Sequence, residues 1–277
     1  MFQVLAPPTD LQPFVRFFWA VRAAGSTAPE RVIPDGCCEL IVHFGPRPQR
    51  WVDAPIAHVQ PQAFVFGQIE RAILLEARGE LDVFGVRFTP AGVAALWGLD
   101  ASTLGPRECA LDDLFSRAQR FCIERIDDST PRIRRTKSNE SAHTLRVRYE
   151  GVVDWLRATA RRGAARYVRR TDAALSALRR ETADLSGVAR SIGLSRRSLE
   201  RDFRTAVGLS PGAYLRLRRI DGCARELRCS DTALSTIALN AGYADHSHFC
   251  REFKDVVGVS PGAYRRDLGL APAAFQE

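Results

Sequence analysis

Hydrophobic and polar positions divide the chain into two parts of different character. In the first part, short runs rich in Phe, Val, Ile and Leu are separated by turn-forming residues such as Pro34-Asp35-Gly36. Runs of this length predict β-strands, and their repetition predicts an antiparallel barrel or sandwich. The strands are expected at residues 14–22, 38–44, 63–69, 72–78 and 81–88.

Helical segments follow the β-rich part. Residues 89–98, TPAGVAALWG, combine Thr89 as a cap, Pro90 in the first turn and Gly98 as a stop, which predicts a short helix. The remaining expectations are a helix at 111–126, a flexible polar linker at 127–143, and helices at 148–168 and 171–182.

A repeat marks the last third of the chain. The segment GLSPGAY at 208–214 returns as GVSPGAY at 258–264. The residues upstream also correspond, with one extra residue in the second copy. The chain therefore contains a duplicated supersecondary structure. The matched landmarks are Ala189 and Ala238, Gly193 and Gly242, Phe203 and Phe253, Gly208 and Gly258, and Tyr214 and Tyr264.

Each copy predicts a short helix, a tight turn and a longer helix, which together form a helix-turn-helix. Gly193 or Gly242 can take the left-handed conformation that ends the first helix. The GLSPGAY phrase then supplies a second stop, a serine cap and a proline in the first turn, so its role is structural. The expected caps are Ser186, Ser195 and Ser210 in the first copy and Ser235, Asp245 and Ser260 in the second.

The second helix of each copy has an apolar face and a polar face. Helices of this kind enter the major groove, where arginine can bond guanine through two hydrogen bonds. The inward side chains are expected to be Leu199, Phe203 and Val207, and in the second copy Phe249, Phe253 and Val257. The outward ones are then Arg197, Arg201 and Arg204, and in the second copy Ser247, Arg251 and Lys254.

Charge is distributed unevenly along the chain. Residues 1–144 hold 16 basic and 17 acidic side chains, whereas residues 145–277 hold 24 basic and 15 acidic ones, so the formal charge of +8 originates in the second half. A cationic half beside a neutral one is the electrostatic pattern of nucleic-acid binding. Part of the charge, at 145–170, is equally well explained as a solvated helix face.

These residues resemble a known family. Residues 171–267 are similar to the double helix-turn-helix DNA-binding domain of AraC-type bacterial transcription regulators, and AGYADHSHFCREFKDVVGVSPGAYRR is close to that family's signature. The resemblance implies two recognition helices, joined by a helix at about 211–228, in successive major grooves on one face of the DNA. Gly222 lies inside the joining helix, where glycine is less favourable than alanine by about 1 kcal/mol.

The resemblance also implies which side chains meet DNA. Base contacts are expected from Arg197, Glu200 and Arg201 in the first copy and from His246, Ser247 and Arg251 in the second. Independently of the resemblance, Arg204 and Lys254 are expected to be phosphate contacts or solvated charges, and Ser186 and Ser235 are expected to contact phosphate.

The passages RVIPDGCCELIVHFG and LDVFGVRFTPAGVAALWG are similar to an amino-terminal β-rich domain found in many AraC-type regulators. This resemblance covers about residues 1–115 and implies a sensory or dimerising module. Trp19, Trp51, Phe64 and Phe66 can line an effector pocket or simply form the core. The predicted class is α+β, with a β-rich domain at 1–126, a linker and connecting helix at 127–170, and an all-α double helix-turn-helix domain at 171–277.

Other kinds of site are weakly indicated. The seven cysteines have scattered spacing, which argues against a disulfide scaffold, although a redox or metal site at Cys37, Cys38 and His43 remains an alternative. His246 and His248 are poorly placed to share zinc, so no metal or cofactor is expected. No apolar run is long enough to span a membrane, and the protein is expected to be soluble and cytoplasmic.

Three functions remain open at this point. They are an effector-responsive transcription regulator, a constitutive DNA-binding regulator, and a DNA-modifying enzyme with a cysteine nucleophile. The enzyme is the weakest, because no nucleophile and base motif or phosphate loop is present. The expected partners are double-stranded DNA, a small-molecule effector, a second copy of the chain and, for an activator, RNA polymerase.

Overall fold

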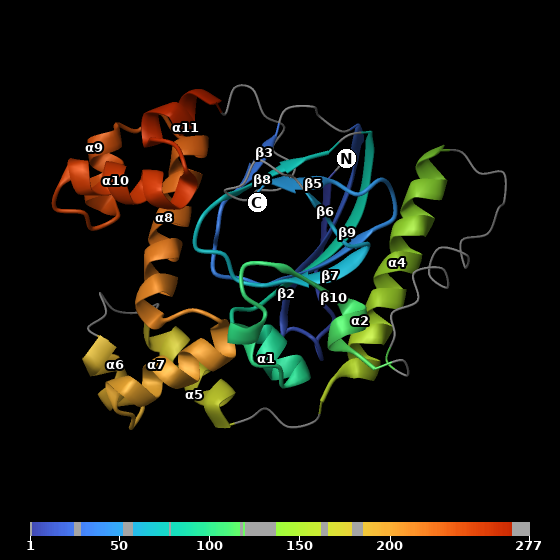
Figure 1. Cartoon of the computed structure of the whole chain (residues 1–277), viewed down its shortest axis with the longest axis horizontal. Coiled ribbons are helices and arrows are strands. Elements are labelled where there is room, and N and C mark those ends of the chain that lie inside the picture. The colour runs from blue at the N-terminus through green and yellow to red at the C-terminus, as the bar shows by residue number, and fades with distance from the viewer. Residues whose placement is uncertain are drawn as a thin grey trace.

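The computed structural model describes residues 2–24, 29–51, 58–77, 79–116, 119, 137–161, 166–178 and 185–267. The amino-terminal part contains two antiparallel sheets, and the carboxy-terminal part is helical (Figure 1). The predicted α+β class is therefore confirmed.

The larger sheet has the strand order β1-β2-β9-β4-β7-β10 and the smaller one β3-β8-β5-β6. Each of the five predicted strands overlaps an observed strand, namely β2, β4, β7, β8 and β9. The unpredicted strands have two to four residues, which is too short for alternation to show. The strands are β1 (Phe2–Leu5), β2 (Val15–Ala24), β3 (Glu30–Val32), β4 (Glu39–His43), β5 (Gln49–Trp51), β6 (His58–Val59), β7 (Ala63–Phe66), β8 (Ile73–Glu76), β9 (Glu80–Phe88) and β10 (Glu108–Ala110).

The helices form two groups along the chain. Between and after the strands lie α1 (Gly92–Trp97), the 3-10 turn η1 (Ala101–Thr103), α2 (Leu111–Leu114) and α4 (Lys137–Thr159). The carboxy-terminal group comprises α5 (Arg166–Leu178), α6 (Leu185–Ser191), α7 (Arg196–Val207), α8 (Pro211–Cys229), α9 (Leu234–Asn240), α10 (His246–Val257) and α11 (Pro261–Asp267).

The two faces of the larger sheet have different environments. Because side chains alternate along a strand, Leu40 and Val42 of β4 lie on one face, where they share a core with Val152 and Leu156 of α4. An aromatic cluster of Phe88, Trp97, Phe115 and Trp155 completes this core. The opposite face of the sheet borders a cavity.

Trp19 lies flat against the cavity face of the sheet. Its register partner is Gly85, where a Cβ atom would lie 2.1 Å from the indole ring. Glycine is therefore required at this position for the indole to approach β9 so closely.

Two helix predictions in the amino-terminal half are wrong in detail. Thr89 does not cap α1; its hydroxyl donates to the carbonyls of Pro13 and Phe14, and Ala91 occupies the cap position without a side-chain bond. The helix expected at 111–126 ends at Leu114, because Phe115 is extended and packs between Trp97 and Trp155. Residues 120–126 lie outside the described part of the chain.

The segment expected as a linker is partly helical. Residues 137–143 belong to α4, while 127–136 are among the residues that the structure does not describe. The helix expected at 148–168 is interrupted, because α4 ends at Thr159 and α5 begins at Arg166. The end of α4 is bound to α1: the Trp97 indole N–H donates to Thr159, and the Arg161 N–H donates to the carbonyl of Leu96.

None of the helices in the described part of the chain is both long and apolar enough to cross a membrane.

Candidate DNA interface and interdomain cavity

The duplicated segments fold into two helix-turn-helix units, α6–α7 and α9–α10. Gly193 and Gly242 have φ values of +68° and +79°, the left-handed conformation that their turns require. Ser195 caps α7 by accepting from the Ser198 N–H, and Asp245 caps α10 by accepting from two N–H groups. The turn chemistry predicted from the repeat is confirmed at these positions.

Two of the expected caps are wrong. α6 begins at Leu185 and α9 at Leu234, so Ser186 and Ser235 lie inside the first turns of these helices. Ala233 precedes α9 without a side-chain cap. The side chain of Ser235 is exposed at the amino-terminal end of α9, a position from which a hydroxyl can meet a phosphate, and Ser186 is half-buried.

The apolar stripes of both recognition helices are buried. Leu199, Phe203 and Val207, and likewise Phe249, Phe253 and Val257, are 0% exposed. The opposite faces of α7 and α10 are exposed to solvent. The exposed residues include Arg197, Arg201, Arg204, His246, Ser247, Arg251 and Lys254, all of them sequence candidates for DNA contact.

Ion pairs on α7 leave its reading face available. Glu200 is half-buried and accepts a hydrogen bond of 3.0 Å from Arg196, one turn earlier. Arg201 is 3.4 Å from Asp202, but its side chain is 72% exposed. Surface pairs of this kind contribute little, so DNA can replace them.

The histidines of the second unit have separate neighbours. The His246 ring lies 3.7 Å from the Cys250 sulfur on the same helix, whereas His248 packs edge-on against Tyr243. Among the residues that the structure describes, no cluster of His, Cys, Asp and Glu could hold a metal.

The helix α8 joins the two units (Figure 1). It is continuous through Gly222, although glycine is unfavourable inside a helix. Asp221 pairs with Arg218 at 3.3 Å and with Arg225 at 3.2 Å, which links the turns on both sides of the glycine. Arg216 connects α8 to α10 through Glu252 and Asp255.

The amino-terminal domain contacts the carboxy-terminal end of each recognition helix. At α10, Arg31 donates to the carbonyl of Val257 at 2.7 Å, the Ala72 N–H donates to Val256 at 2.7 Å, and Arg71 pairs with Asp255 at 3.0 Å. The first two contacts satisfy carbonyls that a helix end otherwise leaves without partners, and the third is an ion pair between side chains.

At α7, the contact is mainly one of packing. Ala91 and Ala94 of the α1 region belong to the same buried core as α7. Gly208, just after α7, lies so close to η1 that a Cβ atom would be 3.0 Å from the Ala101 carbonyl oxygen. The domains therefore meet at both helix-turn-helix units.

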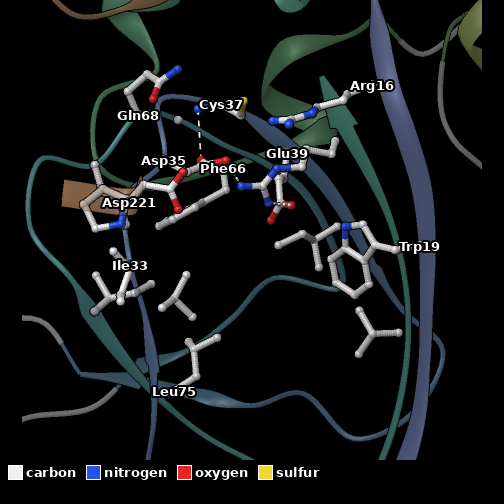
Figure 2. A pocket seen from close by; sticks show the side chains of 18 of the residues that line it. Arg16, Trp19, Ile33, Asp35, Cys37, Glu39, Phe66, Gln68, Leu75 and Asp221 are labelled. Atoms are coloured by element: carbon white, nitrogen blue, oxygen red, sulfur yellow. Dashed lines mark hydrogen bonds and ion pairs between the residues drawn. The ribbon is translucent and has the colours of Figure 1, made fainter. Parts of the chain in front are cut away.

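A cavity of about 130 Å³ lies between the two sheets and extends to α8. Figure 2 shows the apolar side chains of Trp19, Ile33 and Leu75 and, toward α8, the polar side chains of Asp35 and Asp221. The wall from α8 consists of Asp221, Arg225 and Arg228. The cavity thus has walls from both domains.

A charged cluster lies where the cavity approaches α8. Arg87 donates to Glu39 at 2.6 Å and also to Asp35, and both carboxylates line the cavity. Burial lowers the pKa of Arg87 to about 10, so this guanidinium is still charged at neutral pH. Its two carboxylate partners offset the cost of that burial.

The four aromatic pocket candidates have different positions. Trp19 and Phe66 line the cavity, whereas Phe64 is fully buried and packs against the rings of His43 and Phe66. Trp51 ends β5, and its side chain lies outside the described residues. Sequence reasoning missed the polar wall residues Glu39 and Arg87 and considered His43 only as part of a redox or metal site, although polar side chains at alternate positions of apolar strands were a usable signal.

Cys37 and Cys38 lie in surroundings that favour the protonated thiol. Burial raises the pKa values of Cys37 and Cys38 to about 12, so both thiols are protonated at neutral pH. His43 hydrogen-bonds Gln60 at 3.2 Å. These environments are those of packed thiols and do not favour the redox or metal site considered above.

Two family models match separate parts of the chain. A model described as "Helix-turn-helix domain" matches residues 188–267, and one described as "Domain of unknown function (DUF6597)" matches residues 3–110. No curated protein matches the chain.

Several solved structures are similar to the chain. ToxT from Vibrio cholerae is 11% identical, with a TM-score of 0.46 over 90% of this chain and 98% of ToxT. An AraC-type transcriptional regulator from Chromobacterium violaceum is 24% identical, with a TM-score of 0.34 over 38% of this chain and 96% of its own. The DNA-binding domain of AdpA, solved with a target DNA, is 29% identical, with a TM-score of 0.32 over 36% of this chain and 89% of its own.

The helix-turn-helix match covers both repeats almost completely, and each repeat carries a capped recognition helix with an exposed polar face. Residues 188–267 are therefore an AraC-type helix-turn-helix domain, which supports a DNA-binding transcription regulator, and residues 3–110 match a domain of unknown function.

Proposed function

We propose that this regulator reads a specific operator with α7 and α10 in two successive major grooves, and that a small molecule in the interdomain cavity changes its affinity for DNA. The observation that carries the second part is the cavity wall. Asp221, Arg225 and Arg228 belong to α8, the helix that joins the two units, while the other walls belong to the β-rich domain.

The dimensions of α8 support reading of two grooves. The helix has 19 residues and is therefore about 28 Å long at 1.5 Å per residue. Successive major grooves on one face of DNA are about 34 Å apart. Units at the two ends of α8 can thus reach neighbouring grooves with modest adjustment.

The reading faces divide into base and phosphate contacts. We assign base contacts to Arg197, Glu200 and Arg201 on α7 and to His246, Ser247 and Arg251 on α10. Phosphate contacts are assigned to Arg204 and Lys254, further along each helix, and to Ser186 and Ser235 at the starts of α6 and α9. All except Glu200 and Ser186 are exposed in this structure.

A ligand can regulate DNA binding only if it has different affinities for two conformations of the protein. A molecule that touches both domains meets this requirement when α8 shifts relative to the sheets. The alternative is a constitutive regulator, in which occupation of the cavity does not change the affinity for DNA. The proposed setting is the cytoplasm, with a second copy of the chain or RNA polymerase as further partners.

The test begins with an operator selected from a random duplex pool by the full chain. Operator affinity is then measured with and without fractions of a low-molecular-weight cell extract. We expect at least one fraction to change the affinity by about tenfold, within the usual range of allosteric coupling. Leu75→Trp, which fills the cavity, should bind the operator but lose the response, while Gln12→Trp, at an exposed position, should retain it. If no fraction changes the affinity, the regulator is constitutive.

A further inference from the structure

His43 lies at the end of the cavity that is farthest from α8. Residues 39, 41 and 43 of β4 share the cavity face, since side chains alternate along a strand, and all three line the cavity. Glu39 belongs to the charged cluster with Arg87 and so lies at the α8 end of the cavity. His43 is four residues further along the strand, about 13 Å away at 3.3 Å per residue. The His43 residue is only 2% exposed.

Hydrogen bonds around Gln60 determine which nitrogen of His43 carries a proton. The Gln60 amide nitrogen donates to a carboxylate oxygen of Glu108 at 3.3 Å, and a carboxylate can only accept. The amide oxygen of Gln60 must therefore face His43, whose Nε2 lies 3.2 Å away. Nε2–H is the donor in this contact.

The other ring nitrogen of His43 is then an acceptor. Burial lowers the pKa of His43 to about 4, so the ring is neutral at pH 7 and carries one N–H only. Because that proton is on Nε2, Nδ1 presents a lone pair. Nδ1 is buried and has no hydrogen-bond partner anywhere in the described part of the chain.

A buried acceptor without a partner is costly, and native proteins usually supply one. The cavity around His43 has space for a partner, since its volume of about 130 Å³ is several times that needed by a single water molecule. Its nearby walls are largely apolar and include Trp19, Ile41, Leu81 and Val83. The missing group is a hydrogen-bond donor on a mainly apolar molecule.

We infer that the cavity binds an uncharged, largely apolar molecule that donates a hydroxyl or N–H hydrogen bond to Nδ1 of His43. The inference rests on the proposed effector site and names the chemical class that fits it. A carboxylate is disfavoured at this end because it has no donor and would face the lone pair of Nδ1. At the other end of the cavity, Arg87 is already paired with Glu39 and Asp35, so it does not offer a free positive charge to a carboxylate ligand.

The test uses the full chain and three probes of one shape: para-butylphenol, its methyl ether and para-butylbenzoate. Binding is measured at pH 7 by isothermal titration calorimetry. The phenol should bind about tenfold more tightly than the ether or the benzoate, which corresponds to one buried hydrogen bond. His43→Phe should reduce phenol binding to the level of the ether and leave ether binding unchanged.

A second variant guards against misfolding of His43→Phe. His43→Asn places an amide oxygen near the position of Nδ1 and should restore part of the preference for phenol. Circular dichroism and operator binding establish that each variant is folded.

The outcomes separate the inference from the proposed function. Equal or tighter binding of the benzoate, or an unchanged preference for phenol in His43→Phe, would overturn the inference while leaving an effector cavity. If the wild-type chain binds none of the three probes, the inference is wrong; the effector proposal then fails as well only if the extract fractions also leave operator affinity unchanged.

Discussion

The two helix-turn-helix units have the same interior and different surfaces. Phe203 and Phe253 occupy equivalent core positions, and each packs edge-on against the tyrosine of its following GLSPGAY or GVSPGAY segment, at 5.5 and 5.6 Å between ring centroids. On the outward faces, α7 presents arginines where α10 presents His246 and Ser247. The duplication thus preserved the residues that fold each unit while the residues available to DNA diverged.

The units also differ in their contacts with the amino-terminal domain. α7 shares an apolar core with the α1 region, whereas the end of α10 is held by Arg31, Arg71 and the Ala72 N–H. Separating the α7 contact would expose apolar surface to water, whereas at α10 the Arg71–Asp255 pair is exposed and the Arg31–Val257 hydrogen bond is only partly buried, so water can replace these polar contacts at lower cost. The second unit is therefore the one that we expect to move more easily relative to the sheets.

The largest expected effect concerns what the copies share. Phe203→Ala and Phe253→Ala should each lower the free energy of unfolding by about 3–5 kcal/mol, because each removes a fully buried ring. Urea unfolding of the full chain, followed by helical circular dichroism, measures both. Arg204→Ala and Lys254→Ala, at exposed positions, should change the unfolding free energy by no more than about 0.5 kcal/mol. A small effect at only one phenylalanine would show that the two interiors are not equivalent.

Much of this interior could be predicted from the sequence because its determinants are local. A glycine, a capping side chain and an apolar stripe specify each helix-turn-helix within about twenty-five residues, and the strands β2, β4, β7, β8 and β9 follow from short apolar runs. The cap predicted at Thr89 was also read from local sequence and was wrong. The Thr89 hydroxyl instead donates hydrogen bonds to Pro13 and Phe14, which are distant in sequence. Tertiary contacts determined its role.

The cavity could not be predicted because its walls come from distant segments. Asp221 and Glu39 are separated by most of the chain, and only the folded arrangement places both at one cavity. The position of α4 against the sheet also depends on residues distant in sequence. Arg148 of α4 donates to both oxygens of Asp82 on β9, which fixes the helix against the sheet.

The next largest effect separates base reading from phosphate contact on α7. Arg201→Ala should remove a base contact worth about 1–3 kcal/mol and lower affinity for the operator more than for a scrambled duplex. Arg204→Ala should weaken binding to both duplexes alike and reduce the salt slope by about one. Both affinities are measured at several salt concentrations. Equal losses on the two duplexes for Arg201→Ala would contradict its assignment to a base.

The same pair of substitutions on α10 shows whether the second unit reads DNA. Arg251→Ala should lower specificity and Lys254→Ala should lower general affinity, by amounts similar to those of Arg201→Ala and Arg204→Ala. Footprinting should show two protected patches about 10.5 base pairs apart per monomer. A single patch, together with no effect of Arg251→Ala, would leave α7 as the only reading helix.

The smallest expected effect concerns the caps. Ser195→Ala should lower the stability of the first unit by about 1 kcal/mol, the usual cost of losing an amino-terminal cap.

Asp245 accepts from the N–H groups of Ser247 and His248, and the Ser247 bond is the main cause of its lowered pKa. Because the folded pKa of Asp245 lies below its ordinary value of 3.8, the stabilisation is complete above that value and is lost as pH falls through the folded pKa. Ser195 does not titrate in this range. Thermal unfolding from pH 7 to pH 3 should therefore show that the difference in Tm between wild type and Asp245→Asn, which keeps an oxygen acceptor without the charge, shrinks as acid is added. The corresponding difference for Ser195→Ala should stay constant with pH. A constant difference for Asp245→Asn would show that its charge does not contribute to the cap, leaving the two copies capped in the same way.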